Sequence, residues 1–514
     1  MNRTVQIDLT PEQLADQAAV RRAAGAAVGE DVKILRRSID CRRRQVVYHL
    51  MVEVGAKLEG PSSYRVSSLP SNSPQVVVVG AGPAGLFAAL RAIELGIRPV
   101  IVERGKPVDQ RRKDIASLAR NGVVDPDSNW CFGEGGAGTF SDGKLYTRST
   151  KRGDVGAVLQ QFVNHGADPD IMVDVHAHIG TDRLGGIIAN MRATIEAAGG
   201  EYHFNSKVVD FVVNDGRVIG VVTADGAQYE GAAVILATGH SARDIYHMFN
   251  DRGWLLEPKP FALGVRVEHP QELINQLQYH GSGYSSLLPP AAYSLTAQAA
   301  GHGVFSFCMC PGGVIVPAAT AAGEQVVNGM SNSHRNSPFA NSGIAVTVGL
   351  EDIASSSDSP LALLDFQQKV EQAVFHAAGD RIAAPAQRLV DFLHRRESRA
   401  LPRSGYLGQT VQHPLHELLP GFVVDSLAEG FKAFDRKMRG FVSQDALLLA
   451  VESRTSSPVR IPRDKETLQH PQLQGLYPCG EGAGYAGGIV SSAIDGIRCM
   501  EQVYAILGSL CSRK

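Results

Sequence analysis

The apolar positions between residues 75 and 104 predict a strand, a helix and a second strand. The run at 76–79 is continuously apolar, as expected for a strand buried on both faces of a parallel sheet. A glycine-containing turn, a helical pattern and a second apolar run follow it. Residues 184–239 show the order helix, strand, antiparallel meander and buried strand. Together these patterns predict an α/β fold built on a Rossmann-type parallel sheet.

The pattern changes on either side of these segments. Residues 1–60 show a strand, a helix with Pro11 in its first turn, and two more strands, which is typical of a small α+β domain. Residues 61–74 are rich in Ser, Pro and Gly, and we expect a linker there. Residues 258–450 show no regular strand–helix alternation and are predicted to be an inserted mixed α+β substrate domain. The nucleotide-binding domain is then 75–257 together with 451–514.

Composition and charge narrow the class of protein. The 514 residues are 44% hydrophobic and 20% charged, which is ordinary for a soluble globular protein, and the net charge of −2 favours neither nucleic acid nor an anionic membrane as a partner. Seven scattered cysteines favour a reducing compartment over a disulfide framework. Neither an apolar signal segment nor an apolar run of about 18 residues is present in the sequence. We therefore expect a cytoplasmic protein without a membrane span.

The glycines after the first buried strand carry the clearest chemical signal. Gly80-x-Gly82-x-x-Gly85 is the dinucleotide fingerprint, whose glycines permit the turn, the approach of a pyrophosphate and the packing of helix on strand. The helix N-terminus offers N–H groups and a positive dipole end to the phosphates. Glu103 ends the second strand, where a carboxylate accepts from a ribose 2′-hydroxyl, and it argues against NADP. The expected contacts are Gly80, Gly82, Pro83, Ala84, Gly85, Glu103 and Arg104.

A second glycine-rich segment, GEGGAGTFSDGKL at 133–145, follows the second strand and a helix. Successive glycine N–H groups can form an anion-binding concavity, so we expect this loop to contact the dinucleotide. Its apolar residues Phe140 and Leu145 argue against a mobile surface loop. Arg111 precedes it and either neutralises phosphate or lies on a solvated helix face. The residues assigned to the cofactor here are Arg111, Gly136, Gly138, Thr139, Phe140 and Ser141.

Two further segments resemble motifs of the flavoproteins with two dinucleotide-binding folds. VILATGHS at 234–241 resembles the strand and turn that follow the meander in that superfamily, and GLYPCGEGAGYAGGIVSSAIDG at 475–496 resembles its C-terminal flavin motif. The resemblance implies FAD, with a helix pointing at the isoalloxazine and a ribityl contact from an Asp that is Glu481 here. The implied contacts are Val208 for the adenine, and Thr238, Gly239, Gly480, Glu481, Gly487, Gly488, Ile489 and Val490.

Nearly the whole chain is similar to one family, the uncharacterised FAD-dependent dehydrogenases of bacteria and plastids. The strings that carry the resemblance are the glycine-rich segment at 133–145, FCMCPGG at 307–313, NGMSNSHRN at 328–336 and ESRTSSPVRI at 452–461. The resemblance implies a fold and FAD as cofactor, but it implies no substrate. We expect no metal site.

The candidate catalytic residues are polar groups in or near these motifs, and each has an alternative role. Lys144 ends the glycine-rich segment and either binds an anionic substrate or flavin O4, or is solvated. His334 and Arg335 suit a proton donor and a carboxylate clamp, or belong to a polar loop. Arg454 and Arg460 suit a carboxylate or phosphate, or tie domains together through ion pairs.

The pair Cys308-Met-Cys310 has a redox interpretation, but redox dithiols usually use C-x-x-C. We therefore expect a packing or lining role for both cysteines. The sequence contains no second strand–GxGxxG–helix unit, so the external electron donor or acceptor stays open.

The leading prediction is an FAD-dependent oxidoreductase, either a dehydrogenase or a reductase. It transfers hydride between flavin N5 and a small organic substrate, anionic or neutral. One alternative is a flavin-dependent monooxygenase or halogenase, although the halogenase pattern Trp-x-Trp-x-Ile-Pro does not occur. Another is a flavin-bound electron-transfer or RNA-modification partner that docks through the basic run at 42–44. The oligomeric state stays open.

Overall fold

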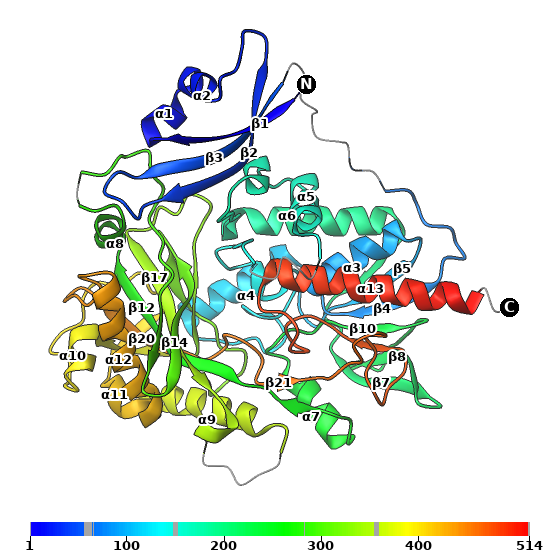
Figure 1. Ribbon diagram of the computed structural model, residues 1–514. Coiled ribbons are helices and arrows are strands. Elements are labelled where there is room, and N and C mark those ends of the chain that lie inside the picture. The colour runs from blue at the N-terminus through cyan, green and yellow to red at the C-terminus, as the bar shows by residue number, and fades with distance from the viewer. Residues whose placement is uncertain are drawn as a thin grey trace.

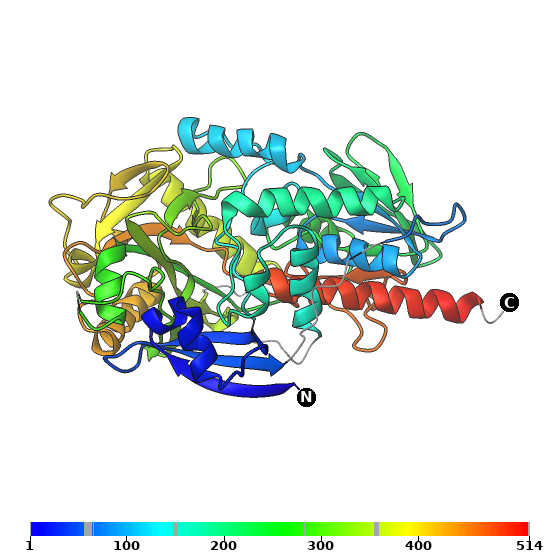
Figure 2. The same cartoon turned by 90° about the horizontal axis from the view of Figure 1, so that it is seen from above.

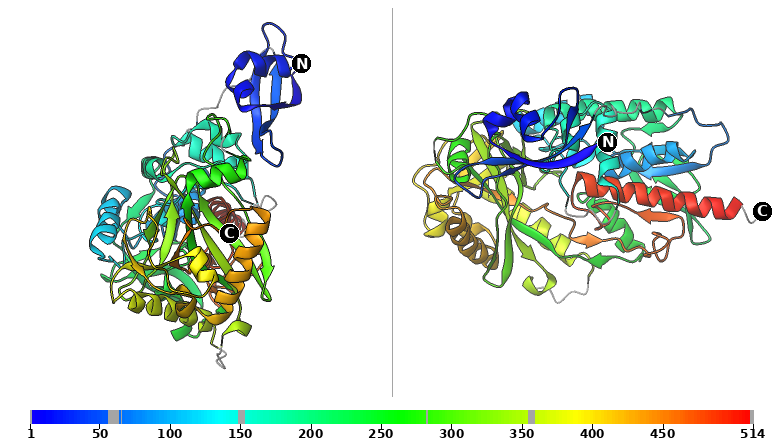
Figure 3. Two further views of the ribbon diagram at one scale, coloured as in Figure 1. Left: turned by 90° about the vertical axis from the view of Figure 1, so that its left-hand side faces the viewer. Right: turned by 45° about the horizontal axis from the view of Figure 1, so that its top comes forward.

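Three parts, each built on its own sheet, make up the molecule. The structure is a computed structural model that describes residues 2–55, 64, 66–147, 153–281, 283–353 and 359–511. A three-stranded sheet near the N-terminus, a five-stranded sheet and a seven-stranded sheet define the parts (Figure 1). The two larger parts lie side by side, and the N-terminal part projects from them (Figures 2 and 3). It contacts one through Arg37, which pairs with Asp174, and the other through Val46, which packs in the core of the seven-stranded sheet. The predicted α/β fold class is confirmed.

The N-terminal sheet has three antiparallel strands in the order β1-β3-β2, with β1 at Arg3–Leu9, β2 at Asp31–Asp40 and β3 at Val47–Gly55. The sequence predicts one helix after β1, whereas the structure has two, α1 (Pro11–Ala15) and α2 (Gln17–Ala23). The break falls at Asp16, because its side chain accepts from the N–H of Ala18 and caps α2.

The five-stranded parallel sheet, in the order β22-β10-β4-β5-β6, carries the nucleotide fingerprint. Its strands are β4 (Gln75–Val79), β5 (Arg98–Val102), β6 (Glu201–His203), β10 (Val234–Leu236) and β22 (Leu476–Pro478). Helices α3 (Pro83–Glu94), α6 (Thr181–Ala197) and α13 (Ile489–Cys511) cover one face (Figure 1). Helices α3 and α13 approach so closely that a Cβ added to Gly496 would lie 2.0 Å from the carbonyl oxygen of Ala84.

The apolar run of β4 is buried on both faces, as predicted. Val76 and Val78 pack with the helices, whereas Val77 and Val79 pack with an antiparallel meander on the other face. The meander consists of β7 (Val208–Asn214), β8 (Arg217–Thr223) and β9 (Gln228–Glu230). Because neighbouring side chains of a strand point to opposite faces, a strand covered on both sides has no place for a polar residue.

The seven-stranded sheet is mixed and has its own hydrophobic core. Its order is β13-β14-β17-β12-β20-β18-β19, and every neighbouring pair is antiparallel except β18 with β19. The strands are β12 (Phe261–Pro270), β13 (Thr296–Ala299), β14 (His302–Cys310), β17 (Phe339–Val348), β18 (Ala383–Arg388), β19 (Gln409–Gln412) and β20 (Leu447–Glu452). Its helices include α8 (Gln271–Gln278), α9 (Ala362–Ala377), α10 (Leu389–Leu393), α11 (Leu415–Leu418) and α12 (Gly421–Lys437).

The remaining elements connect these parts. They are α4 (Val108–Asn121), α5 (Val155–Asn164), α7 (Arg243–Asp251), the pairs β11 (Glu257–Pro258) with β21 (Val459–Arg460) and β15 (Val314–Pro317) with β16 (Val327–Met330), and the 3-10 helices η1 (Gly136–Gly138), η3 (Pro169–Met172) and η4 (Leu350–Asp352). Within the described ranges, no helix combines the length and apolar character needed to cross a bilayer.

Candidate functional site

A cavity of about 680 Å³ has walls from both larger parts of the molecule. Val79, Val102 and Ala237 line it where three parallel strands end. Phe307 and Cys308 line it from β14 of the seven-stranded sheet. The carboxyl ends of parallel strands are where open α/β sheets bind ligands, and the volume is that of a typical cofactor or small-molecule site.

Most of the predicted cofactor residues lie in the walls of this cavity. Those that line it are Gly80, Gly82, Pro83, Ala84, Glu103, Arg104, Gly136, Gly138, Ser141, Val208, Thr238, Gly239, Glu481, Gly487, Gly488, Ile489 and Val490. Five others, Gly85, Arg111, Thr139, Phe140 and Gly480, are not among its lining residues. The cavity therefore joins segments of the chain that are far apart in sequence, as the motifs predicted.

The fingerprint turn is held tightly by Glu103. A Cβ added to Gly85 would lie 1.9 Å from the carbonyl oxygen of Gly80, so helix and strand can pack this closely only with glycine. The Glu103 carboxylate accepts from the N–H of Ala81 at 2.8 Å, Gly105 at 2.8 Å and Gly133 at 3.0 Å. Since a carboxylate has about four acceptor sites, one is left for a ribose hydroxyl.

Arg111 has a different place from the one that its charge suggested. It is completely buried, and it donates to the carbonyl oxygens of Asn129 at 2.8 Å, Trp130 at 2.9 Å and Glu134 at 2.8 Å. Burial lowers the pKa of Arg111 to about 10, and its guanidinium lies 5.0 Å from the centre of the Phe140 ring. Arg111 and Phe140 therefore brace the glycine-rich segment from inside the protein, and neither side chain faces the cavity.

The glycine-rich segment also runs close to the fingerprint turn. A Cβ added to Gly136 would lie 3.0 Å from the Cα of Gly82, and Gly136 has a φ of 60°. The hydroxyl of Thr139 points inward and donates to the carbonyl oxygen of Glu134 at 3.0 Å. Two backbone segments thus meet at the wall without side chains between them, and Thr139 supports that wall without lining it.

The start of α13 forms another wall of the cavity. A Cβ added to Gly487 or Gly488 would meet no atom within 4 Å, so both glycines border open space. Glu481 lies in the same wall, and burial raises the pKa of its carboxyl to about 7. Gly480 is behind the wall and donates its N–H to Asp495 at 2.8 Å.

Of the predicted catalytic residues, Lys144 and Arg454 line the cavity. The ammonium of Lys144 donates to the carbonyl oxygen of Met309. An ammonium has three donors, so that bond leaves two for other partners.

Three predicted catalytic residues lie elsewhere. His334 is exposed and is not among the lining residues. Arg335 binds the buried carboxylate of Asp142 through Nε at 3.2 Å and Nη2 at 2.7 Å. Arg460 pairs with Glu257 at 3.5 Å, between the strands β21 and β11. Arg335 thus acts on the cavity indirectly, because Asp142 is a lining residue.

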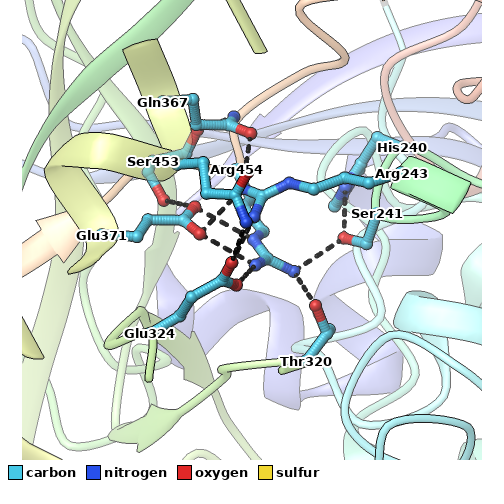
Figure 4. Close-up of polar contacts among 10 residues, drawn as sticks. His240, Ser241, Arg243, Thr320, Glu324, Gln367, Glu371, Ser453 and Arg454 are labelled. Carbon is cyan, nitrogen blue, oxygen red and sulfur yellow. Dashed lines mark hydrogen bonds and ion pairs between the residues drawn. The ribbon is translucent and has the colours of Figure 1, made fainter. Parts of the chain in front are cut away.

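Arg454 is the centre of a buried ion-pair cluster (Figure 4). Its Nε and one Nη2 donor bind Glu371 at 3.1 and 2.9 Å, and Nη2 also binds Glu324 at 3.0 Å. Its Nη1 donates to the hydroxyls of Ser241 and Thr320. A guanidinium has five N–H donors, and these contacts use all of them. Arg454 therefore ties segments of the chain together and has no donor left for a substrate.

Arg243 joins the same cluster from α7. It donates to Glu324 at 2.6 Å and to Glu371 at 2.8 Å, so two arginines face two glutamates (Figure 4). The neighbouring His240 also lines the cavity, and burial lowers its pKa to about 4. His240 is therefore neutral near pH 7 and contributes no positive charge to the cavity.

The cavity also contains polar residues that the sequence motifs did not assign. They include Asp142, Lys207, His240, Asn328 and Tyr485. Asn328 falls within the string NGMSNSHRN, and Tyr485 within the C-terminal flavin motif. Those strings marked the right segments, but only the structure shows which of their side chains reach the cavity. Cys308 lines the cavity, which agrees with its predicted lining role.

Comparison with known proteins covers nearly the whole chain. Family models match for a pyridine nucleotide-disulphide oxidoreductase at 74–250, for an FAD-dependent protein, C-terminal domain-like, at 260–455, and for a domain of unknown function at 1–55. An uncharacterised protein of Clostridium beijerinckii is 39% identical over 507 residues, which is 97% of this chain and 94% of that protein. The chain belongs to this family of FAD-dependent oxidoreductases. The predicted family and the predicted cofactor, FAD, are confirmed.

Solved structures similar to this flavoprotein are more distant. A geranylgeranyl bacteriochlorophyll reductase-like protein from Thermoplasma acidophilum is 12% identical, covers 85% of this chain and 79% of its own, and has a TM-score of 0.36. The open conformation of a flavocytochrome c3 fumarate reductase is 14% identical, with coverages of 85% and 79% and a TM-score of 0.36. At 12% and 14% sequence identity, neither structure identifies the substrate of this chain.

The residues of the cavity fit FAD. Helix α3 begins in the wall that carries the glycine fingerprint. No side chain in the described ranges caps this helix N-terminus, so its backbone N–H groups remain available to an anion. The wall at the start of α13 contains Gly487 and Gly488, where any side chain would enter the open space. The cavity thus offers the N-terminus of α3 where a pyrophosphate would lie, and open space beside Gly487 and Gly488 where α13 begins.

Proposed function

We propose that this flavoprotein is a dehydrogenase or reductase that moves a hydride between FAD and a carbon atom of a small anionic substrate. The observation that carries the proposal is a cationic group, Lys144, in the same cavity as Glu481 and the start of α13. FAD supplies the two-electron chemistry when bound. The protein has to hold the cofactor, orient the substrate and manage one proton.

We assign each group of cavity residues to the part of FAD that its position in the cavity favours. The turn at 80–85 and the glycine-rich segment would hold the pyrophosphate, and Glu103 would hold a ribose hydroxyl. Val208 would contact the adenine. The residues at 487–490 would hold the isoalloxazine, and the positive end of the α13 dipole would favour a reduced, anionic flavin.

Lys144 is the group that we assign to the negative charge of the substrate. Arg454 has no donor left, and Arg335 holds Asp142. Lys144 keeps two donors beyond its bond to Met309, and it lines the open space. A charge-assisted hydrogen bond to a carboxylate or phosphate there fixes the position of the reacting carbon.

Glu481 is the group that we assign to the proton. Its pKa near 7 lets the carboxyl both accept and donate a proton at neutral pH, which is the range where general acid–base catalysis is most effective. The carboxyl can accept the proton that leaves an oxidised substrate, and it can return a proton in the reverse direction. His334, the proton donor expected from the sequence, is exposed and outside the cavity walls.

The test is anaerobic reduction of the purified flavoprotein by NADH, NADPH and a panel of organic acids and phosphates, followed by bleaching of the flavin absorption. Lys144→Met should lower kcat/KM for the reducing substrate about 10- to 100-fold, the value of one charge-assisted hydrogen bond. Lys207→Met, a change of another cavity cation near Val208, should leave kcat/KM unchanged once FAD is saturating.

Two results would contradict the proposal. Rapid bleaching by NADPH with oxygen uptake only when an aromatic compound is present would identify a monooxygenase instead. An equal loss of kcat/KM in Lys144→Met and Lys207→Met would remove the specific role of Lys144.

A further inference from the structure

Strand β14 ends at the cavity with two thiols. Cys308 lines the cavity beside Phe307, and Cys310 is fully buried behind it. The pairing of β14 with β17 shifts register between Phe307 and Cys310, and Cys308 has a φ of 44°. The strand is therefore bent at Cys308, in a backbone conformation that residues other than glycine rarely adopt.

The two thiols are close enough to interact. Cys310 Sγ lies 3.3 Å from the carbonyl oxygen of Cys308, to which it donates. A hydrogen bond between the two thiols lowers the pKa of Cys308 and raises that of Cys310. Residues i and i+2 of an extended strand are about 6.6 Å apart at Cα, inside the range of about 4.4–6.8 Å for disulfides, and a bend shortens that distance.

Two cations hold this segment. Lys144 donates to the carbonyl oxygen of Met309 from the cavity side. Arg266 is completely buried on the other side, where its Nη2 donates to the carbonyl oxygen of Cys308 at 2.6 Å and lies 3.9 Å from Cys310 Sγ. Nearby positive charge stabilises a thiolate, and a thiolate in an accessible position is the reactive form of cysteine.

We propose that Cys308 and Cys310 form a redox dithiol that exchanges two electrons with the FAD bound in the cavity. The proposal rests on the proposed function, which supplies reduced flavin. In this exchange two electrons from the reduced flavin break the Cys308–Cys310 disulfide, and the flavin is oxidised. Cys310 Sγ takes up the proton that the flavin loses on oxidation, and Cys308 Sγ remains a thiolate beside Lys144. The reverse step forms the S–S bond, and the two electrons and that proton pass to the flavin, which is reduced.

The first test is an anaerobic dithionite titration of the oxidised holoprotein. Wild type should take up twice as many electrons per flavin as Cys308→Ser or Cys310→Ser, because each variant retains only the flavin as an acceptor. The matched control is Cys499→Ser, since Cys499 belongs to a second pair of buried, interacting thiols with Cys479. This control should behave like wild type. Equal uptake by wild type and Cys308→Ser, or a loss confined to Cys499→Ser, would overturn the proposal.

The second test uses wild type alone and does not depend on the folding of a variant. The tryptic peptide 267–335 contains Cys308 and Cys310 and no other cysteine. Alkylation under denaturing conditions should add two groups to this peptide from the reduced protein and none from the air-oxidised protein. Two groups in both states would overturn the dithiol while leaving the proposed function intact. A protein that purifies without FAD and cannot be reconstituted with it would instead remove the proposed function.

Discussion

Arg454 offers a sharp test of how the cavity wall is built. The sequence left two roles open for this residue, a clamp for an anionic substrate and a tie between domains. Its five donors are all bound to Glu371, Glu324, Ser241 and Thr320 (Figure 4). Arg454→Met keeps much of the apolar stem but removes the charge, so it should weaken the fold more than it weakens substrate binding.

The magnitude follows from the burial of the cluster. The side chains of Arg454, Glu324 and Glu371 are 6%, 2% and 0% exposed. Without Arg454, two buried glutamates share Arg243 as their ion-pair partner, and removing one partner of a buried ion pair costs about 3–5 kcal/mol. Adding Glu324→Gln restores a neutral cluster, so the double variant should recover about 0.5–3 kcal/mol relative to Arg454→Met.

The assay is urea unfolding followed by circular dichroism, with flavin release recorded on the same samples. Arg395→Met is the control, because its pair with Asp425 is 62% and 55% exposed and should contribute less than about 1 kcal/mol. If Arg454→Met unfolds like wild type and instead raises KM for an anionic substrate, the inference that its donors are all used inside the protein is refuted.

Three other variants test separate parts of the structure. Burial raises the pKa of Glu268 from 4.5 to about 7. The folded protein therefore holds a proton that the unfolded chain has lost, and its free energy of unfolding falls as the pH rises through that interval. In urea unfolding, Glu268→Gln should remove this pH dependence and raise the free energy of unfolding by on the order of 3 kcal/mol at pH 8. Gly85→Ala should reduce soluble yield and flavin content, since its Cβ would lie 1.9 Å from the Gly80 carbonyl oxygen. His334→Ala should leave the rate of substrate-dependent flavin reduction unchanged, because this exposed side chain is outside the cavity walls.

The sequence predicted the segments around the glycine fingerprint that line the cavity because their signals are local. The apolar run at 76–79, the glycines that follow it and Glu103 all lie within about one βαβ unit, whose geometry is the same wherever it occurs. The helix break at Asp16 is also local, and the capping preference of Asp could have indicated it. Neither local signal, the fingerprint that was predicted or the cap that was missed, requires knowledge of which distant segments meet.

The sequence could not predict the interaction partners of the charged residues in this way. For Arg111 the sequence suggested phosphate or solvent, yet carbonyl oxygens satisfy it. For Arg454 the sequence left a ligand clamp and an ion-pair tie open, and only the structure identifies the glutamates that bind it. The partners of Arg454 lie 130 and 83 residues away in the chain, so no spacing rule connects them. The same holds for Arg335, which turns toward Asp142 across 193 residues.

FAD should occupy the cavity at the start of α13, and the flavin content of the purified protein tests this most directly. Gly488→Val would place a side chain in open space, whereas Gly186→Val makes the same change on the exposed surface of α6, where an added Cβ also meets no atom within 4 Å. Wild type and Gly186→Val should purify with one FAD per chain, and Gly488→Val should be folded by circular dichroism but free of flavin. Full FAD occupancy in Gly488→Val would contradict the account.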